Sequence, residues 1–308
     1  PTPFSGPQQK QNIIQFNYCK KKDIIRAILV RTCQLRGAIL RPARFNFHQT
    51  TSLKEACSLS KQGAIPMAGG QALVQDMRLR NCAPAEIINL RQIDEISQKI
   101  SFKHNSLIIG AKVTVTELLE DKNVLERIPV LSEAARKLGD VQIRNFATVV
   151  GNVCWSDPRA NLAVALLACR AKITVMEENS TLAKIDLNDF FSGFRKNVLN
   201  GRIATEIEVP LSERNVGAYL EFSRQPQDLA LVNVAMASAS LERGNFIAIG
   251  GIFNRPIRIE ISKTNLIDEL IKKIEDYNSP YLDDQFATLS HKLDVLRALL
   301  KKIFRRLQ

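Results

Sequence analysis

Two short stretches of the chain combine glycines with hydroxyl and amide side chains. The first, I-P-M-A-G-G-Q-A-L, covers residues 65–73 and ends an apolar run with Gly69-Gly70 before a helical pattern begins. The second, R-N-F-A-T-V-V-G-N, covers residues 144–152 and is followed by Ser156-Asp157-Pro158. Glycine lets a backbone approach a ligand without a Cβ in the way, and it leaves N–H groups free to point at an anion. Each stretch could therefore hold a phosphate.

Three kinds of phosphate site were compared with these stretches. A Rossmann fingerprint needs G-x-G-x-x-G, but Gly69-Gly70 lacks both this spacing and the third glycine. A P-loop needs G-K-[ST], and Gln71-Ala72 stands there instead. A pyrophosphate held between two loops from two modules fits better, with Gln71, Thr148 and Asn152 at turns. Two ordinary tight turns would fit the spacing equally well, so the residues alone leave both interpretations open.

The composition indicates a folded globular protein. At 308 residues, with 45% apolar and 24% charged residues, the chain has room for two or three modules. No apolar run approaches the roughly 18 residues of a membrane helix, and no signal peptide pattern is found, so we expect a cytoplasmic protein without a membrane span.

The net charge of +12 suits nucleic acid, an acidic partner or an anionic cofactor. An aromatic content of 6% offers no stacking platform, which argues against nucleic acid. The six cysteines form no C-x-x-C pair and the three histidines are scattered, which argues against a zinc or iron–sulfur site built by this chain.

Hydrophobic periodicity divides the chain into four parts. Residues 1–40 read as an N-terminal extension with a helical run. Residues 41–96 predict an α/β module in which a helix begins at the Ser52 cap. Residues 97–211 predict a second module with helices that begin at Thr114, Pro129 and Asn161. Residues 212–308 predict an antiparallel meander followed by two helices, the last with an apolar stripe from Phe286 to Phe304.

Five stretches, in order from about Arg41 to the C-terminus, resemble a known family. Residues 68–73, with Met77, Leu79 and Arg80, look like the A-G-G-(H/Q/T)-S-L…M-x-L-R stretch of the FAD-binding medium subunits of molybdenum hydroxylases, the xanthine dehydrogenase and carbon monoxide dehydrogenase type. Residues 144–152 are similar to that family's R-N-x-x-T-(I/L)-G-G-N. The other three are F-F-S-G-F-R-K (190–196), E-I-E-V-P (206–210) and D-L-A-L-V-N-V-A (228–235).

The resemblance implies an α+β fold. Two α/β FAD-binding subdomains of the vanillyl-alcohol-oxidase, or PCMH-like, type would hold FAD between them, and a C-terminal antiparallel sheet with helices would follow. It also implies an oxidoreductase component whose FAD receives electrons from an iron–sulfur small subunit, fed by a molybdopterin large subunit. The electrons would leave to an acceptor such as NAD, a quinone or oxygen.

The resemblance also implies which residues contact FAD, and it assigns no catalytic side chain and no metal ligand. Residues 68–73 and 148–152 would bind the pyrophosphate and ribityl portions, and Leu229 would lie near the isoalloxazine ring. The full set is Ala68, Gly69, Gly70, Gln71, Ala72, Leu73, Thr148, Val149, Val150, Gly151, Asn152, Asp157, Asn161 and Leu229.

Three residues of this set depart from the family pattern. Val150 stands where the family has the first glycine of G-G-N, Ala72 where a serine is usual, and Asn161 where an aspartate is typical. Because valine hardly adopts a positive φ and would fill space beside a phosphate, an altered loop with weak or lost FAD binding is expected. The alternative hypothesis is thus a degenerate, non-catalytic family member that acts as an interaction or assembly protein. A free-standing flavin reductase would need a proton donor facing the flavin, which the sequence does not identify.

Overall fold

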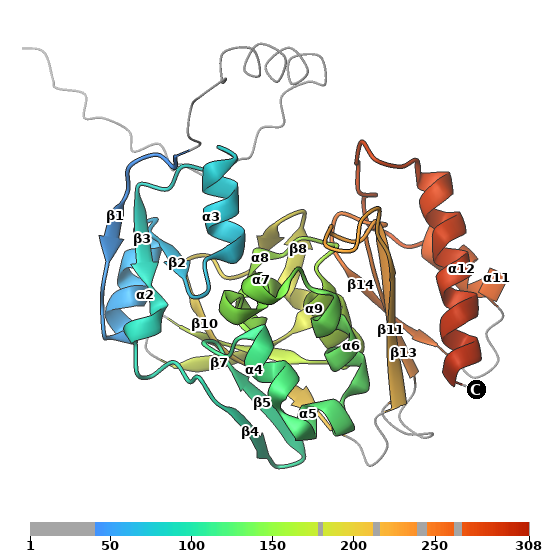
Figure 1. Ribbon diagram of the computed structural model, residues 1–308, viewed down its shortest axis with the longest axis horizontal. Coiled ribbons are helices and arrows are strands. Elements are labelled where there is room, and N and C mark those ends of the chain that lie inside the picture. The colour runs from blue at the N-terminus through green and yellow to red at the C-terminus, as the bar shows by residue number, and fades with distance from the viewer. Residues whose placement is uncertain (1–40, 178–180, 212–215, 239–244, 262–266, 308) are drawn as a thin grey trace, which may run out of the picture. The chain divides into compact units, whose positions relative to one another are not determined.

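A computed structural model describes residues 41–177, 181–211, 216–238, 245–261 and 267–307 (Figure 1). The expected extension at residues 1–40 lies outside these ranges. Within them, the α+β fold is confirmed: the strands form one parallel sheet, one five-stranded antiparallel sheet, a small two-stranded sheet and one C-terminal antiparallel sheet, which is accompanied by two helices.

The first sheet is parallel and has the order β1 (Asn46–His48), β3 (Glu86–Asn89) and β2 (Ile65–Met67). Helix α2 (Leu53–Lys61) begins as expected at Ser52, whose side chain accepts a hydrogen bond from the N–H of Glu55. Helix α3 (Gln71–Arg78) follows β2. Parallel strands end at the same edge of a sheet, so Ala68 after β2 and the 3-10 turn η1 (Leu90–Gln92) after β3 lie at one edge.

The second sheet is entirely antiparallel. Its order is β4 (Ile100–Lys103), β5 (Ser106–Gly110), β10 (Ile203–Pro210), β6 (Lys172–Met176) and β7 (Leu182–Asp186). Six helices connect β5 to β6: α4 (Val115–Glu120), α5 (Lys122–Arg127), α6 (Pro129–Lys137), α7 (Val141–Phe146), α8 (Val149–Trp155) and α9 (Asn161–Ala168). After β7 come α10 (Leu187–Phe190), β8 (Phe191–Gly193) and β9 (Lys196–Asn197). Helix α9 is buried at every residue, as expected for a helix that packs against elements on several sides.

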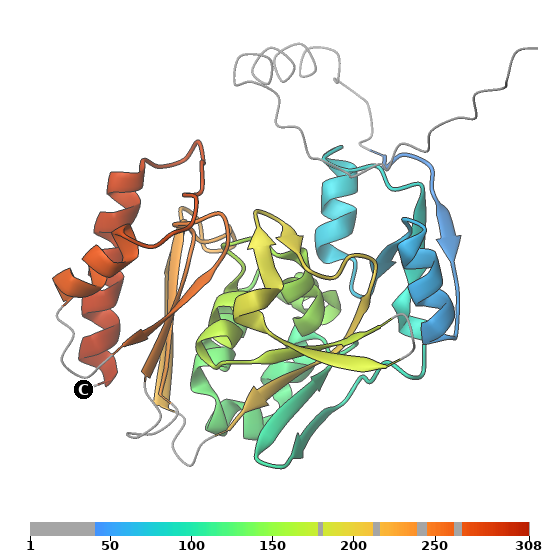
Figure 2. The same cartoon turned by 180° about the vertical axis from the view of Figure 1, so that it is seen from behind.

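The third sheet is the expected meander, in the order β11 (Val216–Phe222), β12 (Val232–Ser238), β13 (Asn245–Gly250) and β14 (Ile257–Ile261). Helices α11 (Ile267–Glu275) and α12 (Leu289–Leu307) cover one face, and α6 and α9 lie against the other (Figures 1 and 2). The α9 face carries small residues such as Ala235 and Ala248, whereas the α12 face carries Val234 and Ile249. Small side chains on one face let α9 approach the sheet closely, so the third sheet lies directly beside the α8–α9 region.

The apolar stripe expected at residues 286–304 is confirmed in part by the structure. The stripe on α12 is core packing, as expected at Leu296 and Leu300, but Phe286 precedes the helix and is 46% exposed. Phe286 instead lies under the guanidinium of Arg224, whose Cζ is 4.0 Å from the ring centroid. Across the described ranges, no helix combines the length and apolar character that crossing a bilayer requires.

Candidate functional site

The first glycine stretch forms the turn between β2 and α3. Gly70 precedes α3 with φ 71° and offers no side-chain cap, so the first N–H groups of the helix are not capped by a side chain. Gly69 lies against the second stretch: a Cβ built on it would lie 2.0 Å from the carbonyl oxygen of Phe146 and 3.1 Å from Cα of Ala147. Glycine at position 69 is therefore what allows the two stretches to touch, backbone against backbone.

The second stretch is not a loop: it covers the end of helix α7 and the start of helix α8. Asn152 therefore lies in a helix, which corrects the expectation that it lies at a turn. Helix α7 ends at Phe146, and α8 begins after Thr148, whose Oγ1 accepts a hydrogen bond from the N–H of Gly151 at 3.1 Å. The short connection is tied down because Ala147 accepts a bond from the N–H of Val115 at 2.9 Å. Thr148 is thus an N-cap, and its hydroxyl hydrogen remains able to donate to a ligand.

The expected strain at Val150 is absent, and that prediction was wrong. Val150 is in the first turn of α8, does not have a positive φ, and is 3% exposed within the hydrophobic core. Its side chain is not among those that line the cavity described below. A helical position tolerates valine at small cost, so Val150 does not prevent the stretch from forming a ligand site.

Replacing Val150 by glycine should therefore not improve FAD binding. Removing a buried valine and placing glycine in a helix should together lower the free energy of unfolding by about 2–4 kcal/mol. Urea unfolding and an FAD titration would measure the two effects. An FAD dissociation constant that falls after Val150→Gly would contradict this account of α8.

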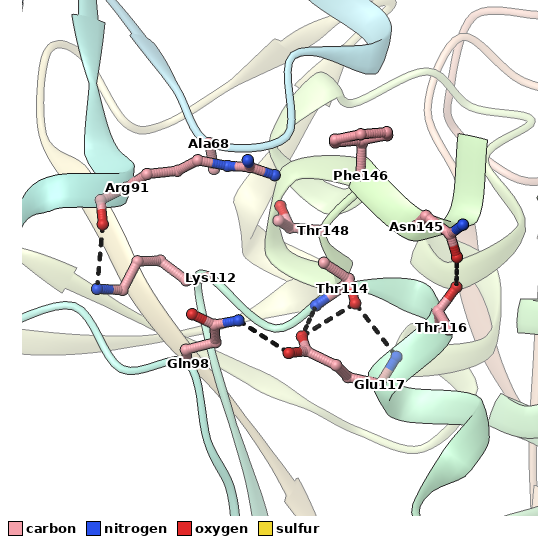
Figure 3. Close-up of a pocket in the computed structure, with 10 residues that line it drawn as sticks. All are labelled: Ala68, Arg91, Gln98, Lys112, Thr114, Thr116, Glu117, Asn145, Phe146 and Thr148. Atoms are coloured by element: carbon pink, nitrogen blue, oxygen red, sulfur yellow. Dashed lines mark hydrogen bonds between the residues drawn. The ribbon is translucent and has the colours of Figure 1, made fainter. Parts of the chain in front are cut away.

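A cavity of about 400 Å³ opens where the two stretches meet (Figure 3). This volume is within the usual range of ligand pockets, roughly 300–1,000 Å³. Ala68 of the first stretch and Asn145, Phe146 and Thr148 of the second line it, so both stretches face the same space. The other lining residues come from η1, the η1–β4 connection and the β5–α4 region, and they are Arg91, Gln98, Lys112, Thr114, Thr116 and Glu117.

The cavity lining carries two positive side chains, Arg91 and Lys112, and one carboxylate, Glu117, which is neutralised in part by hydrogen bonds within the protein. Glu117 accepts bonds from the N–H and Oγ1 of Thr114 and from Nε2 of Gln98, at 2.7, 2.9 and 2.8 Å. Partial burial raises the pKa of Glu117, but these donors outweigh it and hold the pKa below its ordinary value. Lys112 donates to the carbonyl of Ile93 at 3.0 Å, while the Arg91 guanidinium lies 5.6 Å from the ring centroid of Phe146. An anionic ligand would therefore meet two cations and a carboxylate whose charge is well compensated.

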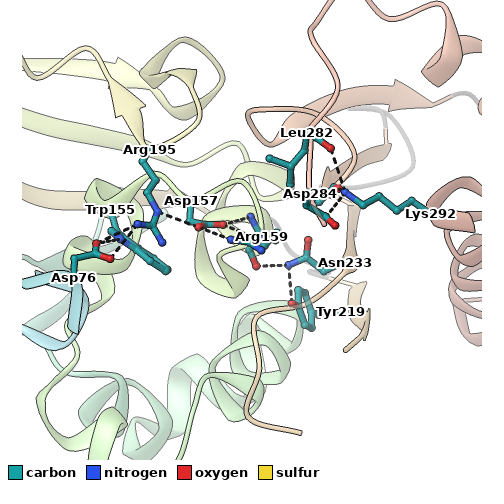
Figure 4. A network of polar contacts seen from close by, with 11 residues as sticks. Asp76, Trp155, Asp157, Arg159, Arg195, Tyr219, Asn233, Leu282, Asp284 and Lys292 are labelled. Atoms are coloured by element: carbon teal, nitrogen blue, oxygen red, sulfur yellow. Dashed lines mark hydrogen bonds and ion pairs between the residues drawn. The ribbon is translucent and has the colours of Figure 1, made fainter. Parts of the chain in front are cut away.

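Asp157 is buried beside the cavity-forming elements but is satisfied by ion pairs. Its carboxylate is 0% exposed and accepts bonds from Nε and Nη2 of Arg159, at 2.9 and 3.0 Å. Arg195 Nε is 3.3 Å from its second oxygen (Figure 4). Because both oxygens of this buried carboxylate are paired with guanidinium groups, Asp157 stabilises the turn after α8 and has no oxygen left unpaired for a ligand.

Asn161 and Leu229 lie on elements next to the third sheet. Asn161 is 5% exposed, and its Nδ2 donates to Oε2 of Glu221 on β11 at 2.7 Å. Tyr219 also donates to Glu221, at 2.8 Å, and burial raises the pKa of Glu221 above its ordinary value. Leu229 lies in the β11–β12 connection, half-buried. The amide donor of Asn161 is therefore engaged within the protein.

The described residues fit the polar middle of FAD. Asn152 Oδ1 is buried and has no hydrogen-bond partner within the described part of the chain, so it can accept a bond from a ribityl hydroxyl. The uncapped start of α3 and the Thr148 hydroxyl supply donors, and Arg91 and Lys112 supply positive charge. These are the groups that a pyrophosphate diester requires.

Sequence reasoning missed most of the cavity lining. Arg91 and Lys112 each follow a strand end, β3 and β5, but the sequence does not show that these ends come together. Thr114 was predicted only as a helix cap, which is confirmed, and the structure adds the capping box that it forms with Glu117. The one sequence signal for this cavity was Arg91, a basic residue that stands two positions after a short parallel strand.

Comparisons with known proteins agree with this geometry. Residues 43–212 match the family described as "FAD binding domain in molybdopterin dehydrogenase". The chain is 29% identical over 280 residues to the glyceraldehyde dehydrogenase medium chain of Sulfolobus acidocaldarius, a match that covers 86% of this chain and 98% of that relative. It is 27% identical over 231 residues to the xanthine dehydrogenase FAD-binding subunit of Escherichia coli O157:H7, covering 70% and 76% of the two chains.

A solved structure of carbon monoxide dehydrogenase from Hydrogenophaga pseudoflava shares the fold, with a TM-score of 0.78 at 23% identity, over 87% of this chain and 98% of that one. The family match covers more than half of the chain and includes both glycine stretches. The chain therefore belongs to the family of FAD-binding domains of molybdopterin dehydrogenases, and it is an FAD-dependent oxidoreductase component of that class.

Proposed function

We propose that this chain carries FAD between two redox partners in a molybdopterin-dependent dehydrogenase. It would receive electrons from iron–sulfur clusters on a small subunit, which a molybdopterin large subunit feeds, and pass them to an acceptor such as NAD, a quinone or oxygen. The observation that supports this most is the meeting of Ala68 and Thr148, from two separate stretches, at one cationic cavity.

Each proposed contact has a defined physical role. The N–H groups at the start of α3 and the Thr148 hydroxyl would donate to the pyrophosphate oxygens. Arg91 and Lys112 would neutralise its charge, and Asn152 would accept from the ribityl chain. Bound FAD supplies the redox chemistry, while the protein holds and orients it.

Partner subunits are proposed from the names of relatives. Similar chains include a subunit alpha of the 6-hydroxypseudooxynicotine dehydrogenase complex of Paenarthrobacter nicotinovorans, 29% identical over 241 residues, 75% of this chain and 81% of that one. Such proteins act as parts of larger assemblies, and we propose the same for this chain. The alternative of a degenerate, non-binding protein loses the support that Val150 gave it, because that residue packs in the core of α8.

An FAD titration of the purified full chain tests the proposal. We expect one flavin bound per chain, seen as a yellow protein and as quenched flavin fluorescence, and we expect an iron–sulfur and a molybdopterin chain among co-purifying masses. A colourless protein that takes up no FAD would contradict the proposal. A protein that binds FAD but never co-purifies with other chains would instead argue for an independent flavoprotein.

A further inference from the structure

The F-F-S-G-F-R-K segment contains an arginine to which the proposed contacts give no role. Arg195 lies in the turn between β8 and β9 with φ 50°, a conformation that is uncommon for residues other than glycine. Its N–H donates to the carbonyl of Ser156 at 3.1 Å. The turn is thereby fastened to the end of α8, and the guanidinium is directed toward α3 (Figure 4).

The Arg195 side chain contacts α3, which begins in the first glycine stretch, and the end of α8, which begins in the second. Nη1 donates to both carboxylate oxygens of Asp76 on α3, at 3.1 and 3.2 Å. Nε is 3.3 Å from Oδ2 of Asp157, which follows α8. The guanidinium carbon also lies 4.6 Å from the ring centroid of Trp155, at the end of α8. One side chain thus joins α3, which begins after Gly70, to α8, which begins after Thr148.

This bridge is more than a surface ion pair. The side chains of Arg195 and Asp76 are only 26% and 16% exposed, and Trp155 shields the guanidinium from water on one side. Asp157 keeps its two bonds to Arg159 if Arg195 is removed, so the loss of Arg195 does not leave a buried charge unpaired. Removal should therefore loosen α3 against α8 without unfolding the protein.

We propose that Arg195 is a positioning residue for the FAD site, which sets the separation of the two stretches by tying α3 to α8. The predicted consequence, weaker FAD binding, rests on the proposed function. The claim that Arg195 holds α3 against α8 can be tested on the protein without FAD. Asp76 is its partner on α3 and also accepts a bond from Trp155 Nε1 at 3.4 Å, so the effects of changing Arg195 and Asp76 should be coupled.

The test compares Arg195→Met with a matched control, Arg258→Met. Arg258 also joins two modules, with Nη1 at 3.1 Å from Asp186 Oδ1, and its guanidinium also lies near an aromatic ring, 5.7 Å from the centroid of Phe246. Neither Arg258 nor Asp186 lines the cavity. We expect Arg195→Met to raise the FAD dissociation constant roughly tenfold or more, and Arg258→Met to leave it within about twofold. Both are measured well below each variant's unfolding temperature, so lost stability alone does not change the result.

A double-mutant cycle separates positioning from general destabilisation. Asp76→Asn also disturbs the bond from Trp155, so it should weaken FAD binding at least as much as Arg195→Met does, and the double variant should be no worse than Asp76→Asn alone. Additive losses, or an unchanged dissociation constant in Arg195→Met, would overturn the proposal. Hydrogen exchange on the protein without FAD gives a second readout: Arg195→Met should speed exchange in α3 and α8, and Arg258→Met should not.

FAD binding and hydrogen exchange test the proposed function and the Arg195 bridge separately. A wild-type chain that binds no FAD refutes the proposed function, and faster exchange of α3 and α8 in Arg195→Met would still support the bridge. Unchanged exchange in Arg195→Met refutes the bridge itself, whether or not FAD binds.

Discussion

Replacing Gly69 by alanine is expected to weaken FAD binding strongly while leaving a folded protein. The added Cβ would lie 2.0 Å from the carbonyl oxygen of Phe146 and 2.9 Å from its carbonyl carbon. Both atoms belong to the backbone, so no side chain can rotate to make room, and the two stretches must separate. Gly69 does not have a positive φ, so the effect would come from this contact and not from backbone strain.

The expected size follows from the cost of forcing extra volume into a packed contact, about 1–3 kcal/mol of stability. If this cost falls on the bound state, the FAD dissociation constant should rise by about 5- to 150-fold, because each 1.4 kcal/mol of lost binding is roughly tenfold. Fluorescence titration with FAD and a thermal melt would measure the two effects.

Gly193→Ala is the control for Gly69→Ala. A Cβ on Gly193 would meet its nearest neighbours, Asn254 and Lys196, at 3.8 and 3.9 Å, which are ordinary contacts. Gly193 also lacks a positive φ, so the same substitution should change FAD affinity by less than about twofold. If Gly69→Ala binds FAD as tightly as Gly193→Ala does, the two stretches do not form the cofactor site.

Replacing Lys292 by methionine should be the most destabilising single change in the C-terminal part of the chain. Lys292 on α12 is 1% exposed, lies 2.5 Å from Oδ2 of Asp284, and donates to the carbonyl of Gly251 at 2.9 Å (Figure 4). Burial raises the pKa of Asp284, but its bonds from Lys292 and from two backbone N–H groups hold it below the ordinary value. Methionine would leave that carboxylate buried and charged without its partner.

Breaking one side of a buried ion pair costs about 3–5 kcal/mol, and urea unfolding would measure this loss. Adding Asp284→Asn to Lys292→Met should recover part of it, because no buried charge is then left over. Lys301→Met, at an exposed position of the same helix, should change stability by less than about 0.5 kcal/mol. A loss below about 1 kcal/mol for Lys292→Met would show that the pair contributes little.

The Lys292 contact also reaches the turn after α8. Gly251 has φ 85°, and its N–H donates to the carbonyl of Pro158 at 3.1 Å. The third sheet thereby supports the turn that holds Asp157 by a path separate from Arg195. Stability of the C-terminal helices and order in the cofactor region are therefore physically connected.

Local signals predicted most of the secondary structure. The Ser52 and Thr114 caps mark the starts of α2 and α4, as expected. These features depend on neighbouring residues, which a sequence displays directly. The meander of the third sheet could be predicted for the same reason, since successive antiparallel strands need only short connections.

The geometry of the proposed FAD site could be predicted only in part, because its remaining features depend on contacts between distant residues. The second stretch was expected to be a glycine loop, yet the N-cap bond of Thr148 and the burial of Val149 and Val150 make it a helix start. The contact of Gly69 with Phe146 has no local signature, and the place of Arg91 after a parallel strand does not show which cavity it lines. The family resemblance identified the two stretches, but not the charged side chains between them.

A crystal structure of the protein with FAD would test the central claim most directly. The account predicts the pyrophosphate beside the Ala68–Gly70 turn and the Thr148 hydroxyl, with the Asn152 oxygen accepting a hydrogen bond from the ribityl chain. FAD bound elsewhere, with the cavity between the two stretches filled only by water, would contradict it.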